Sequence, residues 1–503
     1  MQKAKLILDR DFVIGQIDPR IYGSFVEHLG RCVYGGLYEP DHPAADEDGF
    51  RRDVLALVRD LGVTTVRYPG GNFVSGFRWE DSVGPREQRP VRLDQAWSTT
   101  EPNTFGLHEY MAWCQKAGVQ PLYSVNLGTR GPAEARDLVE YANFPGGSCW
   151  SDLRKRNGAP EPFGIKLWCL GNEMDGPWQI GHKTAQEYGR VAHEAGKLMK
   201  WMDPSIELVV CGSSASDMPT FVDWEKTVLD ECYDTVDYIS LHRYYGNPAG
   251  DTASFLARTM DMDAFIQTVA AVCDAVKGKK HSEKTMYLSF DEWNVWYHSG
   301  QQDEEVLKRN KWGRALPLLE DVYTFEDALL VGSMLMTLIR NADRVKIACL
   351  AQLVNVIAPI MTETGGRAWA QTIYWPFLHA SRFGRGTSLR PLVESPTYDC
   401  DDYKSVPYLD AAAVFHGDGG LTVFCVNRSE TEDMTLDLDL RAFDDLALTE
   451  HTLLHHGDVH AVNTAEDPHA VRPEPGPGGA LAGGKGSVVI PALSWNVLRF
   501  EKR

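Results

Sequence analysis

The strongest constraint in the sequence is an alternation between residues 20 and 380, where short apolar or aromatic runs are separated by longer segments of helical period. This alternation is typical of βα units built on a parallel sheet. The runs expected to form strands cover residues 21–27, 65–69, 120–126, 165–173, 207–212, 238–242, 286–292 and 347–354. The segments expected to form helices include residues 49–61, 106–117, 184–202, 253–276 and 325–340. Eight such units predict an α/β protein with a (β/α)8, or TIM, barrel, in which functional side chains lie at the C-terminal ends of the strands.

Beyond about residue 385 the pattern changes to short strands separated by turn residues. Residues 434–440 alternate strictly between apolar and polar side chains, as a half-buried strand does. Several such segments predict a C-terminal all-β sandwich of jelly-roll type. Residues 3–17 have no place in the barrel pattern and are expected to join the sandwich, while residues 476–486 are expected to form a glycine-rich loop. The predicted domains are a barrel of residues 18–385 and a sandwich of residues 1–17 plus 386–503.

The charge of the chain argues against two classes of partner. With 50 Lys and Arg against 70 Asp and Glu, the net charge is -20 at pH 7. A protein of this sign repels nucleic-acid phosphates and anionic lipid, so neither nucleic acid nor membrane is expected as a partner. The most apolar helical segment, residues 328–339, has 12 residues, whereas a membrane span needs about 20.

Other features indicate a cytoplasmic protein without a metal or cofactor. The N-terminal residues contain only a three-residue apolar stretch before Asp9 and lack the apolar core of a secretion signal. The ten cysteines include no Cys-x-x-Cys pair, which favours buried free thiols over disulfides or a zinc site. Lys197 stands where a zinc-protease motif begun by His193 would need a second histidine.

Two of the predicted strands end in a carboxylate. An apolar run stops at Gly171 and is followed by Asn172 and Glu173, and a second run ends in Asp291 and Glu292. These are the fourth and seventh strands of the predicted ring, so Glu173 and Glu292 are expected on facing walls of the barrel mouth. The other polar and aromatic residues at or just beyond the strand ends are Glu27, His28, Arg67, Asn72, Trp97, Asn126, Trp178, His242, Tyr244, Trp296 and Gln352. Carboxylates, amides and aromatic faces together indicate a site for a neutral, polyhydroxylated sugar.

A carboxylate pair in such a site has a specific chemistry. A separation of about 5 to 5.5 Å is typical of retaining glycoside hydrolysis and about 6.5 to 9.5 Å of inversion; we expect retention. The charge of one carboxylate raises the pKa of the other and keeps it protonated for donation to the leaving oxygen. Asn172 is expected to bond the hydroxyl next to the reacting carbon, and His242 and Tyr244 to orient or discharge the nucleophile.

Motifs spread over the chain carry a family resemblance, at residues 21–31, 66–73, 168–182, 290–297 and 351–360. With these motifs the sequence closely resembles the family 51 glycoside hydrolases, chiefly α-L-arabinofuranosidases. The resemblance implies that Glu173 is the acid/base and Glu292 the nucleophile. It places Glu27, Arg67, Asn72, Asn172, Tyr244 and Gln352 in the furanose pocket, with Trp97 and Trp296 on the leaving-group side. It also implies a barrel whose C-terminal sandwich recruits the N-terminal strand, a homo-oligomer, often a hexamer, and intracellular action on imported oligosaccharides.

The expected function is therefore exo-acting, retaining removal of terminal α-L-arabinofuranosyl residues from arabinan or arabinoxylan oligosaccharides. A β-xylosidase or endo-β-glucanase on the same barrel, and a non-catalytic sugar-binding protein, are the alternatives. Arg67 is either a ligand contact or the partner of an acid such as Glu27, and His242 either positions Glu292 or contacts sugar. Trp178 is either a core residue or a stacking surface for sugar, and it stays outside the predicted set.

Overall fold

The computed structural model describes residues 1–502, and its centre is a closed ring of eight parallel strands. In chain order these strands are β3 (Gly23–Phe25), β4 (Thr65–Tyr68), β7 (Gln120–Val125), β8 (Leu167–Leu170), β9 (Glu207–Val210), β10 (Tyr238–Tyr245), β11 (Tyr287–Val295) and β12 (Val345–Leu350). β12 pairs with β3 and closes the barrel. The predicted barrel is confirmed, and β10 and β11 run three residues further than expected, past His242 and Glu292.

Helices surround this ring. They are α1 (Arg52–Leu61), α2 (Leu107–Ala117), α3 (Pro132–Asn143), α4 (Cys149–Arg156), α5 (Ala185–Met202), α6 (Asp223–Cys232), α7 (Thr252–Leu256), α8 (Thr259–Lys280), α9 (Gly300–Asn310), α10 (Phe325–Arg340) and α11 (Tyr374–Phe383). The single helix expected over residues 253–276 is wrong, because the chain forms α7 and then α8. α5 begins at a capping box in which Thr184 and Glu187 satisfy each other's backbone N–H groups.

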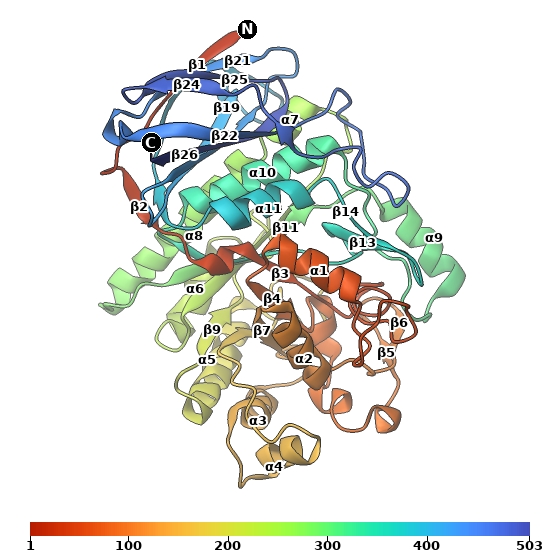
Figure 1. The fold of residues 1–503 in the computed structure, drawn as a ribbon. Coiled ribbons are helices and arrows are strands. Elements are labelled where there is room, and N and C mark those ends of the chain that lie inside the picture. The colour runs from red at the N-terminus through yellow and green to blue at the C-terminus, as the bar shows by residue number, and fades with distance from the viewer. Residues whose placement is uncertain (503) are drawn as a thin grey trace.

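The C-terminal residues form two further sheets, as predicted. One sheet contains β1 (Gln2–Ile7), β16 (Leu392–Glu394), β21 (Met434–Asp439), β24 (Gly479–Ala482) and β25 (Lys485–Ile490). The other contains β2 (Val13–Gln16), β15 (Thr387–Leu389), β19 (Leu409–Phe415), β20 (Leu421–Asn427), β22 (Leu446–His455), β23 (Glu474–Pro475) and β26 (Ser494–Lys502). β1 and β2 each join one sheet, and Figure 1 shows the red β1 beside the blue β21 and β25. The domain boundary at residue 385 stays a prediction.

The glycine-rich loop expected at residues 476–486 is wrong. Residues Gly479–Ala482 form β24, which pairs antiparallel with β25. Gly483 and Gly484, with φ of 56° and 72°, make the two-residue turn between them. A Gly-Gly pair suits this type of hairpin because both turn residues need positive φ.

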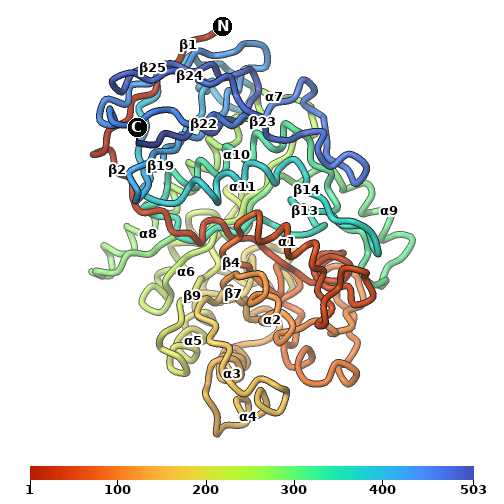
Figure 2. Tube along the Cα trace, viewed as in Figure 1, coloured from red at the N-terminus to blue at the C-terminus, as the bar shows by residue number. Residues whose placement is uncertain are grey.

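The sandwich rests on the barrel through α10 and α11, which lie between the two in Figure 1. Trp495 of β26 packs on Gly332 of α10, where an added Cβ would lie 2.6 Å from the indole. Its Nε1 donates to His379 of α11 across 3.0 Å. Fifteen of the sixteen residues of α10 are buried, as expected for a helix with the barrel on one side and the sandwich on the other. The tube in Figure 2 shows β1 and β25 at one end of the molecule and α3 and α4 at the other.

Among the described residues, no helix is both long and apolar enough to span a membrane. Ten free cysteines are present, eight of them buried, which agrees with the interpretation as isolated thiols.

Candidate active site

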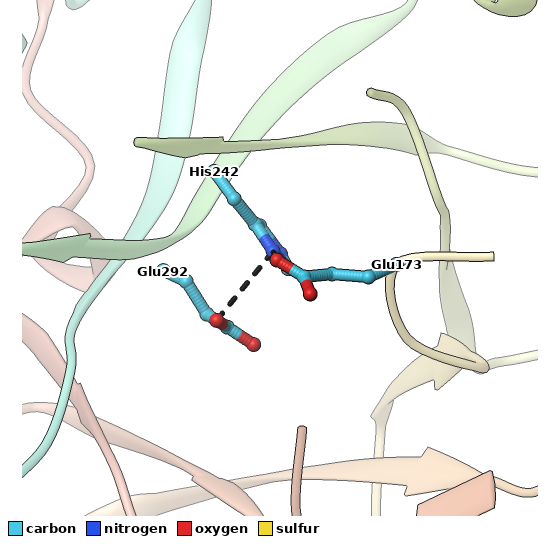
Figure 3. A group of neighbouring side chains, drawn as sticks. All are labelled: Glu173, His242 and Glu292. Carbon is cyan, nitrogen blue, oxygen red and sulfur yellow. Dashed lines mark hydrogen bonds and ion pairs between the residues drawn. The ribbon is translucent and has the colours of Figure 1, made fainter. Parts of the chain in front are cut away.

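The two predicted carboxylates meet at the C-terminal end of the barrel. Glu173 follows β8 after a turn in which Gly171 has a φ of 91° and Glu173 itself a φ of 42°. Glu292 lies within β11. An oxygen of each carboxylate and a nitrogen of His242 all lie within 4.8 Å of one another, and Figure 3 shows His242 beside the pair. The separation of the carboxylates is therefore in the range of retaining enzymes rather than inverting ones.

Glu292 is held by two donors. Arg67 Nη1 donates to its Oε1 across 2.6 Å, and the Tyr244 hydroxyl donates to its Oε2 across 2.8 Å. Arg67 is 1% exposed, and its other nitrogen, Nη2, donates to Asn172 Oδ1 across 2.6 Å. The acid that Arg67 pairs with is thus Glu292 and not Glu27. The charge pair fixes the carboxylate and balances its buried charge.

His242 connects the two acidic strand ends. Its Nδ1 lies 2.9 Å from Glu173 Oε1 and 3.6 Å from Glu292 Oε2, and its Nε2 lies 2.8 Å from Asp291 Oδ1. Burial alone would lower the pKa of His242, but the charge of Glu292 and the hydrogen bonds to Asp291 and Glu173 raise it to about 10. Burial opposes the ionisation of Asp291, yet the charge of Arg67 and the bond from His242 hold its pKa below the ordinary value. At neutral pH, His242 is therefore protonated on both ring nitrogens and Asp291 is ionised.

Glu173 sits in an environment that favours its protonated form. Burial raises the pKa of Glu173 and the charge of Glu292 adds to this, although the bonds from His242 and Trp178 lower it. Trp178 Nε1 donates to Glu173 Oε2 across 2.6 Å. A carboxylic acid with a raised pKa that faces a pocket suits the role of general acid.

A second buried acid closes the site. Glu27 Oε1 accepts from the Phe73 N–H at 2.9 Å and from Trp97 Nε1 at 3.0 Å, and its Oε2 accepts from Gln352 Nε2 at 3.1 Å. Burial raises the pKa of Glu27 to about 8, against the hydrogen bonds from Phe73 and Trp97. Such a group hydrogen-bonds sugar hydroxyls without carrying a full negative charge at neutral pH.

These residues surround a pocket of about 450 Å³. Of the predicted site residues, the ones that line it are Glu27, Asn72, Trp97, Glu173, Tyr244, Glu292, Trp296 and Gln352. Arg67, Asn172 and His242 lie outside this lining set and are 1%, 1% and 2% exposed. Arg67 and His242 contact the carboxylates, and Asn172 contacts Arg67 and Gln179. The structure therefore favours positioning over sugar contact for His242.

Sequence reasoning left several residues of the site out of the predicted set, among them Trp178 and Asp291. Trp178 is 50% exposed and lines the pocket, so its interpretation as a core residue is wrong. Asp291 was recognised as a strand-end acid but was not assigned to the site, although it bonds His242. Its position next to Glu292 was the available signal. Adjacent residues of a regular strand point to opposite faces, but the pairing register of β10 and β11 shifts between Ser240 and His242, so Asp291 also reaches His242.

Two groups of side chains among residues 1–502 have the spacing of metal ligands. One is Glu173, His242 and Glu292, where the Arg67 guanidinium already supplies a positive charge and competes with a cation. The other is Asp46, Glu47 and Asp48, and all three carboxylates bond the ammonium group of Lys116.

Known proteins with similar sequences and structures agree with a site for sugar hydrolysis. The model of the α-L-arabinofuranosidase 1 domain matches residues 57–264, and that of the α-L-arabinofuranosidase C-terminal domain matches residues 291–494. The chain is 57% identical to an intracellular exo-α-(1→5)-L-arabinofuranosidase 1 of Bacillus subtilis over 100% of both chains, and 58% identical to an intracellular exo-α-(1→5)-L-arabinofuranosidase of Halalkalibacterium halodurans over 99% of both. Its structure is similar to that of a family 51 α-L-arabinofuranosidase from Bifidobacterium longum, with a TM-score of 0.95 and 46% identity over 100% of both chains.

The barrel, its carboxylate pair and these similarities define a glycoside hydrolase. More narrowly, the chain belongs to the α-L-arabinofuranosidases of glycoside hydrolase family 51.

Proposed function

We propose that the protein removes terminal, non-reducing α-L-arabinofuranosyl residues from arabinan and arabinoxylan oligosaccharides, with retention of configuration. The observation that carries this is the placement of Glu173 and Glu292 oxygens within 4.8 Å of one another in a pocket lined by amides and aromatic rings. Retention requires such a short separation, since no room for a water molecule is left between sugar and nucleophile.

In the first step, a Glu292 oxygen attacks the anomeric carbon while Glu173 gives its proton to the glycosidic oxygen. The bond to the leaving group breaks and a glycosyl ester on Glu292 forms. Arg67 and Tyr244 hold the Glu292 oxygens for this attack. Asn172, fixed by Arg67 and by Gln179 Oε1 at 3.1 Å, orients the sugar hydroxyl beside the reacting carbon.

In the second step, Glu173 acts as a base. The charge of Glu292 is lost in the ester, so one of the causes that raise the pKa of Glu173 disappears. The ionised Glu173 takes a proton from water, water attacks the anomeric carbon, and the ester bond to Glu292 breaks. His242 stays protonated throughout and stabilises the carboxylate of Glu173.

The remaining pocket residues hold the furanose ring. Glu27 and Gln352 bond each other and face the pocket with Asn72, so they accept and donate to ring hydroxyls. Trp97 and Trp296 border the leaving-group side, where aromatic faces pack against sugar C–H groups.

The relatives named for the (1→5) linkage support that linkage as the first to test. Incubation with α-(1→5)-L-arabinotriose should give arabinose and arabinobiose from the earliest time point, because exo action removes one end unit. Release of 4-nitrophenol from the aryl α-L-arabinofuranoside, but not from the β-D-xylopyranoside, separates the proposal from β-xylosidase activity. Tight binding of arabinobiose without any turnover would favour a sugar-binding protein.

Two further properties are proposed on the same basis. The relatives named intracellular support a cytoplasmic location. The family resemblance supports a homo-oligomer, with a hexamer as the specific expectation. Sedimentation-velocity centrifugation of the full chain at several concentrations tests the hexamer against a monomer or dimer.

A further inference from the structure

Trp178 makes a direct contact with the acid/base carboxylate. Its Nε1 lies 2.6 Å from Glu173 Oε2, while His242 Nδ1 lies 2.9 Å from Oε1. Both oxygens of Glu173 therefore face an N–H donor. Hydrogen bonds donated to a carboxylate stabilise its charged form.

The loop holds the indole in this place. An added Cβ on Gly176 would lie 2.5 Å from Trp178 Cε2 and 2.7 Å from Cζ2, so the ring lies directly over the glycine. The Gly176 N–H donates to the Glu173 backbone oxygen at 2.9 Å, and the Gln179 N–H to that of Gly176 at 3.0 Å. A residue larger than glycine at position 176 would therefore push the indole away.

The same contact has opposite effects on the two steps of the reaction. As an acid, Glu173 carries its proton on Oε2, because Oε1 accepts from the charged His242, a stronger donor than the neutral indole that faces Oε2. The Trp178 N–H points to that same Oε2 and competes with the proton. As a base, Glu173 is a carboxylate, and the Trp178 bond stabilises it.

We propose that Trp178 is a positioning residue for Glu173. Its indole N–H stabilises the carboxylate of Glu173 in the second step, and it makes only a weaker hydrogen bond to Oε2 while that oxygen carries the proton used in the first step. This rests on the proposed function, since it assigns Glu173 the acid/base role. Trp178 lines the pocket and is 50% exposed, so a leaving group that enters there contacts the ring while Glu173 is protonated.

The proton balance is simple. In the first step the Oε2 proton moves to the glycosidic oxygen as the bond from the anomeric carbon breaks, and Trp178 then donates to the new carboxylate. In the second step Oε2 regains a proton from the attacking water as the ester to Glu292 breaks. Trp178 keeps its own proton throughout.

Besides the neutral indole of Trp178, several charged or titratable groups lie around the carboxylate pair. His242 and Tyr244 come from β10, Asp291 and Glu292 from β11, and Arg67 from β4. Among these, His242 donates to Glu173 and Glu292 repels its charge. A substitution at position 178 leaves these groups in place, so a change in titration reports on the indole N–H.

The test compares three variants with the unmodified protein. Trp178→Phe removes the N–H and keeps an aromatic ring, and Gly176→Ala keeps the indole but displaces it. Trp296→Phe is the matched control, because Trp296 lines the same pocket and its ring contacts Tyr244.

The pH dependence of kcat/KM is measured with phenyl α-L-arabinofuranoside, whose poor leaving group needs the acid. Loss of a donor to the carboxylate raises the pKa of Glu173, so the basic limb should move up by about one pH unit in Trp178→Phe. Gly176→Ala should move it in the same direction, and Trp296→Phe should lower kcat/KM without moving the limb.

A second readout needs no turnover. Infrared pH titration, with Glu173→Gln subtracted as reference, follows the protonated carboxyl band of Glu173 directly. The proposal predicts a higher midpoint in Trp178→Phe than in the unmodified protein. Unchanged midpoints and an unchanged basic limb would overturn the role of Trp178 and leave it as a stacking surface. Absence of hydrolysis by the unmodified protein would instead contradict the proposed function, with the infrared titration still deciding on Trp178.

Discussion

Arg67 Nη1 donates to Glu292 Oε1 across 2.6 Å, with both side chains buried in the barrel mouth. Removing Arg67 leaves a buried carboxylate without its partner, which costs about 3 to 5 kcal/mol. We therefore expect Arg67→Met to lower the free energy of unfolding in urea by about that amount. The double variant Arg67→Met with Glu292→Gln should recover most of the loss, because no unpaired charge remains. A double variant no more stable than Arg67→Met would show that the charge pair is not the cause.

The roles of the two glutamates predict opposite products with azide. In Glu173→Ala, the glycosyl ester still forms from 4-nitrophenyl α-L-arabinofuranoside, and azide should open it to the α-azide, with restored release of 4-nitrophenol. In Glu292→Ala, azide should attack directly and give the β-azide. Product configuration is read by proton NMR. The same anomer from both variants would contradict the assignment.

The general acid also predicts a dependence on the leaving group. Glu173→Ala should lose about 10²- to 10⁴-fold in kcat/KM on arabinobiose, whose leaving alcohol needs a proton. The loss on 2,4-dinitrophenyl α-L-arabinofuranoside should be much smaller, since that phenol leaves without protonation. Equal losses on both substrates would indicate that Glu173 acts in some other way.

His242 predicts a fall in stability at alkaline pH. Its pKa is raised from 6.5 to about 10, so its contribution is fully present below pH 6.5 and is lost as the pH rises through about 10. The slope is at most about 1.4 kcal/mol per pH unit. Urea unfolding at a series of pH values should show this slope in the unmodified protein and lose it in His242→Gln. A slope that persists in the variant would place its origin elsewhere.

Glu27 predicts a slope in a lower pH window. Its pKa is raised from 4.5 to about 8 by burial, so its contribution to stability is fully present below pH 4.5 and is lost as the pH rises through about 8. Glu27→Gln removes this titration. The free energy of unfolding of the variant should therefore rise, relative to that of the unmodified protein, between pH 4.5 and about pH 8. The disturbed bond to Gln352 shifts the whole curve but not its slope. Parallel curves for the two proteins would contradict the account.

The sequence predicts which residues gather at the site more completely than it predicts the contacts between their side chains. Apolar runs that end in a polar residue are enough to locate strand ends, and the ring order then brings Glu173 and Glu292 together. The partner of Arg67 was not predictable in this way, because the choice between Glu27 and Glu292 depends on side-chain directions within the mouth. His242 illustrates the same limit, since its role depends on burial behind the carboxylates.

Loops were predicted less well, for physical reasons that differ between cases. Trp178 lies over Gly176, a contact made by a turn whose shape follows from positive φ at Gly171 and Glu173. A strand-end glutamate with positive φ is uncommon and gives no signal in the sequence. The hairpin of β24 and β25, in contrast, was signalled by Gly483 and Gly484 and was overlooked because the region is rich in glycine.

Proton NMR of the anomeric signal during hydrolysis of 4-nitrophenyl α-L-arabinofuranoside with methanol present tests the central claim most directly. A glycosyl ester on Glu292 should be captured by methanol on the face that water would attack, giving methyl α-L-arabinofuranoside. Accumulation of the β-anomer as the first product would contradict retention and the role of Glu292 as nucleophile.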